Sequence, residues 1–186
     1  MKKKLLTSLI LIIFYLMVAI PFKVMVVIPG FTDIRPVTIL GPIFGLYFGI
    51  PGCVIFAFMN LVMDIVGDSL RWSSIAGLVA NFAGPFFILI FWKKLKAKGV
   101  ELTLKTPGNV GLFSLSLILA ALLEAVIITP AVALTYPDVN ALTFAISVIA
   151  NTSIFPICFG IPIIIIIKEE IKWKTCIDKM KSDVIK

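Results

Sequence analysis

Polar side chains interrupt the apolar stretches of this sequence at a shared depth. Counted inward from the outer ends of the predicted helices at ~1.5 Å per residue, Asn60, Asn81, Glu124 and Asn151 each lie roughly 10 to 18 Å deep. Asp64 lies one helical turn from Asn60, on the same face. Amides and carboxylates are costly in lipid, so they usually face a bundle interior, a partner or a cavity. These residues therefore predict a polar layer that hydrogen-bonds a ligand.

Charged and aromatic residues of two predicted outer loops lie above this layer. Asp33 and Arg35 belong to the first loop, and Asp68, Arg71 and Trp72 belong to the second. We expect them to cover the opening of a ligand site. The alternative is structural: the asparagines join helices by interhelical hydrogen bonds, and the loop charges mark the water interface.

The residue types exclude several chemistries. The chain contains no histidine, which excludes His-based metal sites and Ser-His-Asp catalysis, and it contains no Walker-type phosphate loop. Its three cysteines are scattered without metal-ligand spacing. We therefore predict no catalytic residue, metal or cofactor. A membrane enzyme acting on lipids, with Asp64 and Asp68 as metal carboxylates, is kept as the least favoured alternative.

The elements that position these residues must cross a membrane. The 186 residues are 60% hydrophobic and 15% charged, with a mean hydropathy of +1.12, which suits lipid rather than water. Six apolar helices are predicted, with a tight turn at Pro51-Gly52 between the second and third. They are expected at residues 5–27, 37–50, 53–66, 75–92, 110–134 and 141–167. The fold class is thus an all-α membrane protein with a six-helix bundle at residues 1–170 and a basic tail at 171–186.

The positive charge of the chain indicates its orientation. The net charge is +7, and the lysines gather at residues 2–4, 93–105 and 168–186. Because Lys and Arg are retained on the cytoplasmic side, both termini and the central basic loop are expected inside. An even number of crossings agrees with this arrangement. The basic residues therefore describe topology, and we predict no nucleic-acid site.

A stripe of small residues follows one face of the second predicted helix. Gly41, Gly45 and Gly49 recur every four residues, the spacing that lets membrane helices approach closely. Packing within the chain is the favoured interpretation. Docking of a partner protein on this stripe is the alternative.

One segment carries a family resemblance. It reads IRPVTILGPIFGLYFGIPG at residues 34–52, and NLVMD follows at residues 60–64 and GD at 67–68. This pattern, with the size and six-helix layout, resembles the substrate-binding S components of energy-coupling factor (ECF) transporters. The layout covers roughly residues 1 to 170, whereas the recognisable motif covers residues 34–68.

The resemblance implies a function and partners. S components bind a vitamin or related nutrient in an outer-half cavity beneath the loop that joins helices 1 and 2. They dock on a transmembrane scaffold protein and two ATPases, and topple in the bilayer to release substrate. First helices of the family often carry an Ala-x-x-x-Ala docking pattern, of which Ala19 alone is present here. The resemblance thus implies a multi-pass protein of the bacterial plasma membrane.

The leading hypothesis is a binding subunit for a small, water-soluble nutrient, without enzyme activity. Carboxylates outnumber deep cations in the polar layer, so a neutral, zwitterionic or cationic ligand fits better than a dianion. A hypothesis of a different class is a membrane sensor or assembly protein, in which the polar groups only hold helices together.

Overall fold

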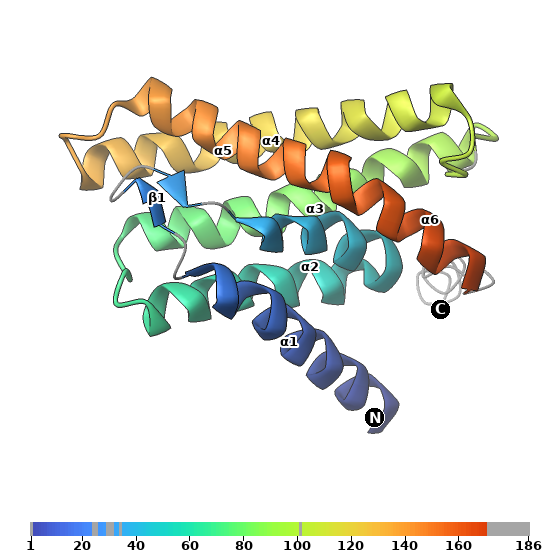
Figure 1. Ribbon diagram of the computed structural model, residues 1–186, viewed down its shortest axis with the longest axis horizontal. Helices are drawn as coiled ribbons and strands as arrows, with labels where there is room; N and C mark the ends of the chain where they lie inside the picture. The colour runs from blue at the N-terminus through green and yellow to red at the C-terminus, as the bar shows by residue number, and fades with distance from the viewer. Residues whose placement is uncertain (1, 24–25, 29–31, 34, 101, 171–186) are drawn as a thin grey trace.

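The computed structural model describes residues 2–23, 26–28, 32–33, 35–100 and 102–170, which are almost entirely helical (Figure 1). The predicted tail at 171–186 lies outside the described residues. The elements in chain order are α1 (Lys2–Lys23), β1 (Val26–Ile28), β2 (Thr32–Asp33), the 3-10 helix η1 (Pro36–Ile39), α2 (Leu40–Val66), α3 (Ser73–Ala97), α4 (Pro107–Thr135), α5 (Ala141–Phe155), the π-helix η2 (Pro156–Gly160) and α6 (Ile161–Glu170).

Within the described residues, four helical segments are long and apolar enough to cross a membrane. A shorter apolar helix spans Leu5–Pro21. These lengths and compositions fit the predicted class of all-α membrane protein. The four segments are Pro36–Val66, Ser73–Ala97, Pro107–Thr135 and Ala141–Ile167.

The segment after α1 departs from the prediction. The first helix ends at Lys23 rather than near Val27. Strand β1, most of which was expected as helix, pairs antiparallel with β2, which was expected as loop. The residues of β1 read Val-Val-Ile, and such β-branched side chains favour extended backbone over helix. A small hairpin therefore precedes η1.

Helix α2 is a helical hairpin rather than one straight rod. Gly49 has φ 63° and ψ −146°, which breaks the helix into a first arm (40–48) and a second arm (50–66). The rings of Phe44 and Phe56 have centroids 6.3 Å apart, whereas residues twelve apart in a continuous helix are separated by ~18 Å. The chain therefore reverses at Gly49, two residues before the predicted turn at Pro51-Gly52.

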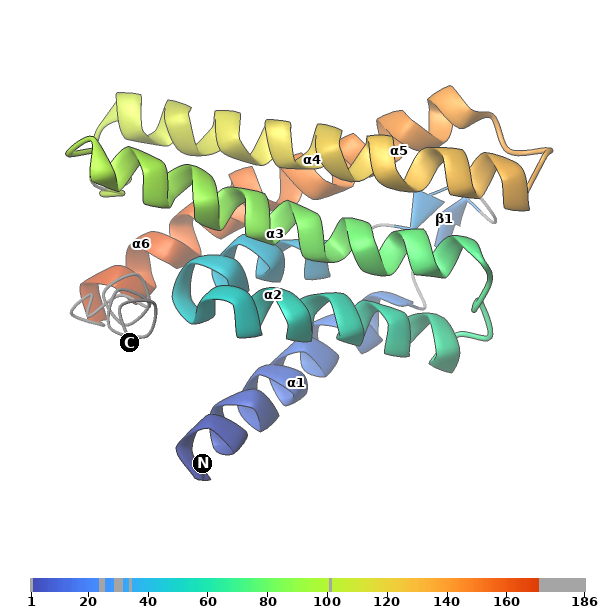
Figure 2. The same cartoon turned by 180° about the vertical axis from the view of Figure 1, so that it is seen from behind.

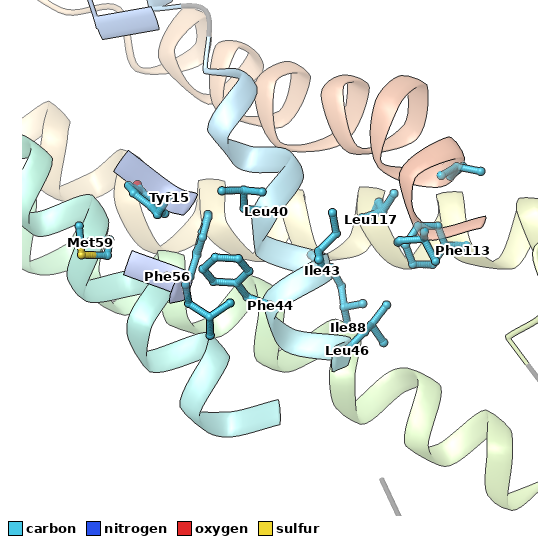
Figure 3. Packing of buried hydrophobic residues seen from close by; sticks show 14 of the residues in the cluster. Tyr15, Leu40, Ile43, Phe44, Leu46, Phe56, Met59, Ile88, Phe113 and Leu117 are labelled. Atoms are coloured by element: carbon cyan, nitrogen blue, oxygen red, sulfur yellow. The ribbon is translucent and has the colours of Figure 1, made fainter. Parts of the chain in front are cut away.

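The helices pack side by side around a continuous core. The α2 hairpin packs along α3, α3 along α4 and α4 along α5, while α1 slants away from the bundle (Figures 1 and 2). Figure 3 shows Phe44 and Phe56 together with Tyr15 of α1 at the centre of the core. An edge-to-face contact between Tyr15 and Phe56 packs α1 against the α2 hairpin, and the centroids of the two rings are 5.7 Å apart.

The predicted docking residues are covered by the chain itself. A Cβ on Gly45 would lie 2.7 Å from the Pro85 carbonyl oxygen of α3, and one on Gly41 would lie 3.3 Å from Pro85 and Phe56. Ala19 is also buried, and Gly49 forms the break in α2. These residues thus present no free surface to a partner in this conformation, and internal packing accounts for Gly41 and Gly45.

The last predicted helix runs without a break, but it changes from α-helix to π-helix and back. Residues 141–167 run through α5, η2 and α6, with a π-helix beginning at Pro156. Proline lacks the N–H that would bond to the carbonyl four residues earlier, which favours such a local change of winding. The Tyr47 hydroxyl of α2 lies 3.4 Å from the Ile164 carbonyl oxygen and joins α6 to the bundle.

Candidate functional site

Four helical elements and η1 enclose a small cavity in the bundle. Its volume is about 10 Å³, which is close to the space that one water molecule needs. Most of its wall is apolar, and the polar contributions come from Thr38 of η1, Asn81 of α3, Glu124 of α4 and Thr152 of α5. The remaining lining residues are Gly41, Pro42, Phe56, Pro85, Ile88, Leu117 and Ala120.

Among the described residues that line this cavity, Glu124 is the charged one. It is 7% exposed, and its Oε2 accepts a hydrogen bond of 3.4 Å from the Thr152 hydroxyl. Within the described part of the chain, no lysine or arginine pairs with this carboxylate. Glu124 lies eleven residues from the end of α4 at Thr135, a distance of ~16 Å along the helix. The depth predicted for Glu124 along its helix agrees with this distance, and the residue lines the cavity.

Gly84 makes room for the Glu124 side chain. A Cβ added to Gly84 would collide with the Glu124 carboxyl group across the interface of α3 and α4. Pro85 follows immediately and lines the cavity. The Gly-Pro pair in the middle of α3 is thus the feature that lets a carboxylate lie against a neighbouring helix.

Asn81 faces the same cavity from one turn before Pro85. Its Nδ2 donates to the Gly77 carbonyl oxygen at 2.7 Å, so its acceptor Oδ1 is the atom available to a ligand. Pro85 has no N–H to offer the Asn81 carbonyl, which therefore lacks its α-helical donor. Asn81 therefore offers its Oδ1 as an acceptor, and its Nδ2 has one donor engaged with Gly77.

Asn151 lies beside the cavity and fastens η1 to α5. Its Oδ1 accepts from the Arg35 backbone N–H at 3.2 Å, and its backbone carbonyl lies 2.8 Å from the Thr38 hydroxyl, which donates. Its Nδ2 donates to the Ser147 carbonyl oxygen at 3.1 Å. Asn151 thus bridges two segments, as in the structural alternative, and it does not line the cavity. We name the Arg35–Asn151 and Thr38–Asn151 contacts the η1 clasp.

Four predicted site residues lie away from the cavity. Asn60 and Asp64 are half-buried on the second arm of α2 but do not line the cavity. Arg71 is exposed and bonds to the Leu70 carbonyl oxygen through its guanidinium, and Trp72 is 83% exposed. A cover over the cavity formed by Arg71 and Trp72 is therefore not present in this conformation.

Of the two residues predicted in the first loop, Arg35 is described with its side chain and Asp33 is not. Arg35 contributes its backbone to the η1 clasp, and its side chain lies within electrostatic range of the buried Tyr15, as does Asp64. The side chain of Asp33 lies outside the described residues. Within the described ranges, no group of three or more His, Cys, Asp or Glu residues could hold a metal, so Asp64 and Asp68 have no third ligand of these types.

Sequence reasoning missed Thr38, Thr152 and Gly84. Hydroxyls in membrane helices usually bond to a carbonyl of their own helix, so a lone threonine carries little information in a sequence. One pattern could have identified them: Thr38, Asn81 and Thr152 each precede a proline by four residues, at Pro42, Pro85 and Pro156. These are the three non-acidic polar residues of the cavity.

Comparison of the chain with models of known protein families, with characterised proteins and with solved structures finds no match. The resemblance at residues 34–68 therefore rests on the quoted residues alone.

Proposed function

We propose that this protein is a membrane-embedded binding subunit that captures a small polar nutrient at the Glu124 cavity. The observation that carries the proposal is the convergence of Thr38, Asn81, Glu124 and Thr152, from η1 and three different helices, on one cavity in an otherwise apolar bundle. Polar groups at this depth are costly and usually serve a ligand or a pathway. The resemblance of residues 34–68 to ECF S components also supports nutrient binding.

The chemistry of the cavity favours a ligand rich in hydrogen-bond donors. Glu124 offers a carboxylate, Asn81 offers Oδ1, and the hydroxyls of Thr38 and Thr152 retain lone pairs. An anion would be repelled by Glu124 in a region of low dielectric constant. Neutral, zwitterionic or cationic nutrients therefore fit this site, and dianions do not.

Capture of a nutrient requires the cavity to open. A volume of about 10 Å³ accommodates one water-sized guest, far less than the 300–1,000 Å³ typical of small-molecule sites. The η1 clasp closes one side of the cavity through two hydrogen bonds to Asn151. Separation of η1 from α5, which breaks these two hydrogen bonds, is the opening movement that we propose.

The proposal includes a topology and partners. We propose six crossings, with both termini in the cytoplasm of a bacterial cell; the lysine distribution and the reversal of α2 at Gly49 support this topology. Since the chain has no ATP-binding loop, energy for uptake would come from a transmembrane scaffold protein and two ATPases of the ECF type. The scaffold would then contact a surface other than the buried Gly41 and Gly45.

A ligand screen tests this proposal. The purified protein in detergent is heated with individual vitamins and modified bases, and the unfolding temperature is measured by fluorescence of a thiol-reactive or tryptophan probe. One compound class is expected to raise the unfolding temperature in a dose-dependent manner, because a ligand that binds only the folded state stabilises it. Glu124→Gln is expected to lose this response, whereas Asp138→Asn in the exposed turn after α4 is expected to keep it.

The second candidate is a sensor or assembly protein without transport, and it is favoured if no nutrient stabilises the protein. The observation that supports this candidate is that the described asparagine bonds, such as Asn81 to Gly77, serve the fold and leave little free volume. Failure of every nutrient to stabilise the protein, together with equal unfolding temperatures for wild type and Glu124→Gln, would contradict nutrient capture and leave the structural role.

A further inference from the structure

We propose that the Glu124 cavity is a binding site for one dehydrated monovalent cation, with Na⁺ and K⁺ as the candidates. This goes beyond nutrient capture, because it concerns the closed cavity itself and needs no nutrient to be bound. The starting point is an unbalanced charge. Glu124 is 7% exposed, and in the described part of the chain its carboxylate has one neutral hydrogen-bond partner and no cationic one. A buried carboxylate of this kind is neutralised either by a proton or by a bound cation, and the oxygen ligands around Glu124 favour the cation.

The groups around Glu124 are oxygen ligands of the kind that hard cations prefer. Thr152 places its hydroxyl oxygen 3.4 Å from Oε2, and Thr38 and Asn81 complete the polar lining. The Asn81 amide nitrogen is engaged with Gly77, which leaves its oxygen for the cavity. Carboxylate, amide and hydroxyl oxygens are common ligands of hard cations. Within the described residues, no basic side chain lines the cavity.

Two residues that line the cavity have backbone carbonyls without their usual α-helical donors. Pro85 and Pro156 lack the N–H groups that the carbonyls of Asn81 and Thr152 would accept in an α-helix. Both carbonyls belong to residues that line the cavity, and a π-helix begins at Pro156. Helix interruptions that release carbonyls near the centre of a bundle are the means by which secondary transporters coordinate Na⁺. Thr38 shares the spacing with Pro42, although the Leu40 N–H reaches its carbonyl.

Size and charge select the ion. A cavity of about 10 Å³ admits one particle the size of a water molecule and excludes a hydrated ion. One carboxylate neutralises one positive charge, so a monovalent cation makes the site electroneutral. A divalent cation would leave a net charge in the bundle, and the described residues offer no further carboxylate to this cavity. An anion is excluded by Glu124.

Direct cation binding tests the inference in the full chain without any nutrient. The purified protein is equilibrated with ²²Na⁺, and bound counts are measured while unlabelled Na⁺, K⁺ or choline competes. Saturable binding of one ion per chain is expected, with displacement by Na⁺ or K⁺ but not by choline, which is too large for the cavity. In parallel, NaCl or KCl is expected to raise the unfolding temperature above that in choline chloride at equal ionic strength.

Variants assign the binding to this cavity. Glu124→Gln keeps the shape and removes the charge, so saturable binding and cation-dependent stabilisation are expected to be lost. Thr152→Val removes one ligand oxygen at nearly constant volume and is expected to weaken binding several-fold, which keeps the test decisive if Glu124→Gln does not fold. Asp138→Asn is the matched control and is expected to bind as wild type does.

Two results would overturn the cation site. The first is an absence of saturable binding of either ion to the folded wild-type protein, which would mean that a proton neutralises Glu124. The second is binding that persists unchanged in both Glu124→Gln and Thr152→Val. Either result leaves nutrient capture open, because the ligand screen reads a different compound and is run at constant salt. Conversely, cation binding without any nutrient response would support the ion site and contradict the binding-subunit proposal.

Discussion

Glu124 lies in the bundle because its neighbour on α3 has no side chain. The Glu124 carboxyl group occupies the space where a Gly84 Cβ would lie, and the Thr152 hydroxyl approaches it from α5. The position of one carboxylate therefore depends on three helices. This dependence distinguishes a built polar site from an isolated charge, which would incur its desolvation cost without a compensating arrangement.

Two glycines of α3 give a matched test of this arrangement. Gly84→Ala is expected to destabilise the protein by about 1–3 kcal/mol, since the added methyl group collides with Glu124 and forces the helices apart. Gly77→Ala is the control: its Cβ would lie 3.5 Å from Ile128, an ordinary contact, so little change is expected. Chemical unfolding in detergent measures both. Adding Glu124→Ala to Gly84→Ala should recover part of the loss, and strict additivity would contradict the proposed collision.

Residue depth predicted part of this site, for a physical reason. Glu124 and Asn81 were found because ionisable and amide groups are rare in lipid, whatever their sequence neighbours. Thr38 and Thr152 were missed because hydroxyls are tolerated anywhere along a membrane helix by bonding to its carbonyls. Asn60 was expected in the same layer, but depth does not specify which face of a helix a residue occupies. Contact between helices decides that, and no pattern in one helix encodes it.

At the scale of elements, special backbone positions shape the bundle. Gly49 reverses α2, Pro85 follows the glycine that accommodates Glu124, and Pro156 begins the π-helix between α5 and α6. The pair of short helices around Pro51-Gly52 was predicted from these punctuating residues. The β1–β2 hairpin was not, because Val26–Ile28 continues the apolar run of α1 and reads as helix by hydropathy alone.

The reversal of α2 depends on glycine at position 49. With φ 63° and ψ −146°, Gly49 has a backbone conformation that other residues adopt only with strain, so Gly49→Ala is expected to cost about 1–3 kcal/mol of stability. Gly111→Ala serves as the control, because its Cβ would meet nothing within 4 Å and alanine favours a helix. Unfolding in denaturing detergent compares the two variants. Equal stabilities would show that residues 49–52 tolerate another turn geometry.

The whole molecule has two ends of different chemical character. The β1–β2 hairpin and the turns at 67–72 and 136–140 lie at one end, and the loop at 98–106 lies at the other (Figures 1 and 2). The start of α1 and the end of α6 are directed toward the second end. The lysine clusters predicted this grouping, since charge retention sorts loops by side. The described start of α1 and end of α6 thus lie toward the same end of the molecule as the loop at 98–106, and the cytoplasmic position of that end stays a prediction.

Labelling from outside the cell tests that orientation. In a background with the native cysteines replaced by serine, Ser69→Cys and Asp138→Cys are expected to react with a membrane-impermeant maleimide in intact cells. Lys98→Cys, and Ile50→Cys beside the reversal of α2, are expected to react only after the membrane is opened, because both lie at the basic end. If α2 instead crossed the membrane once without reversing, Ile50 would lie within the membrane. With the N-terminus in the cytoplasm, Ser69 would then lie on the cytoplasmic side and Lys98 on the outer side. Reaction of Lys98→Cys in intact cells, with protection of Ser69→Cys, would therefore contradict both the cytoplasmic position of the lysines and an outer opening for the Glu124 cavity.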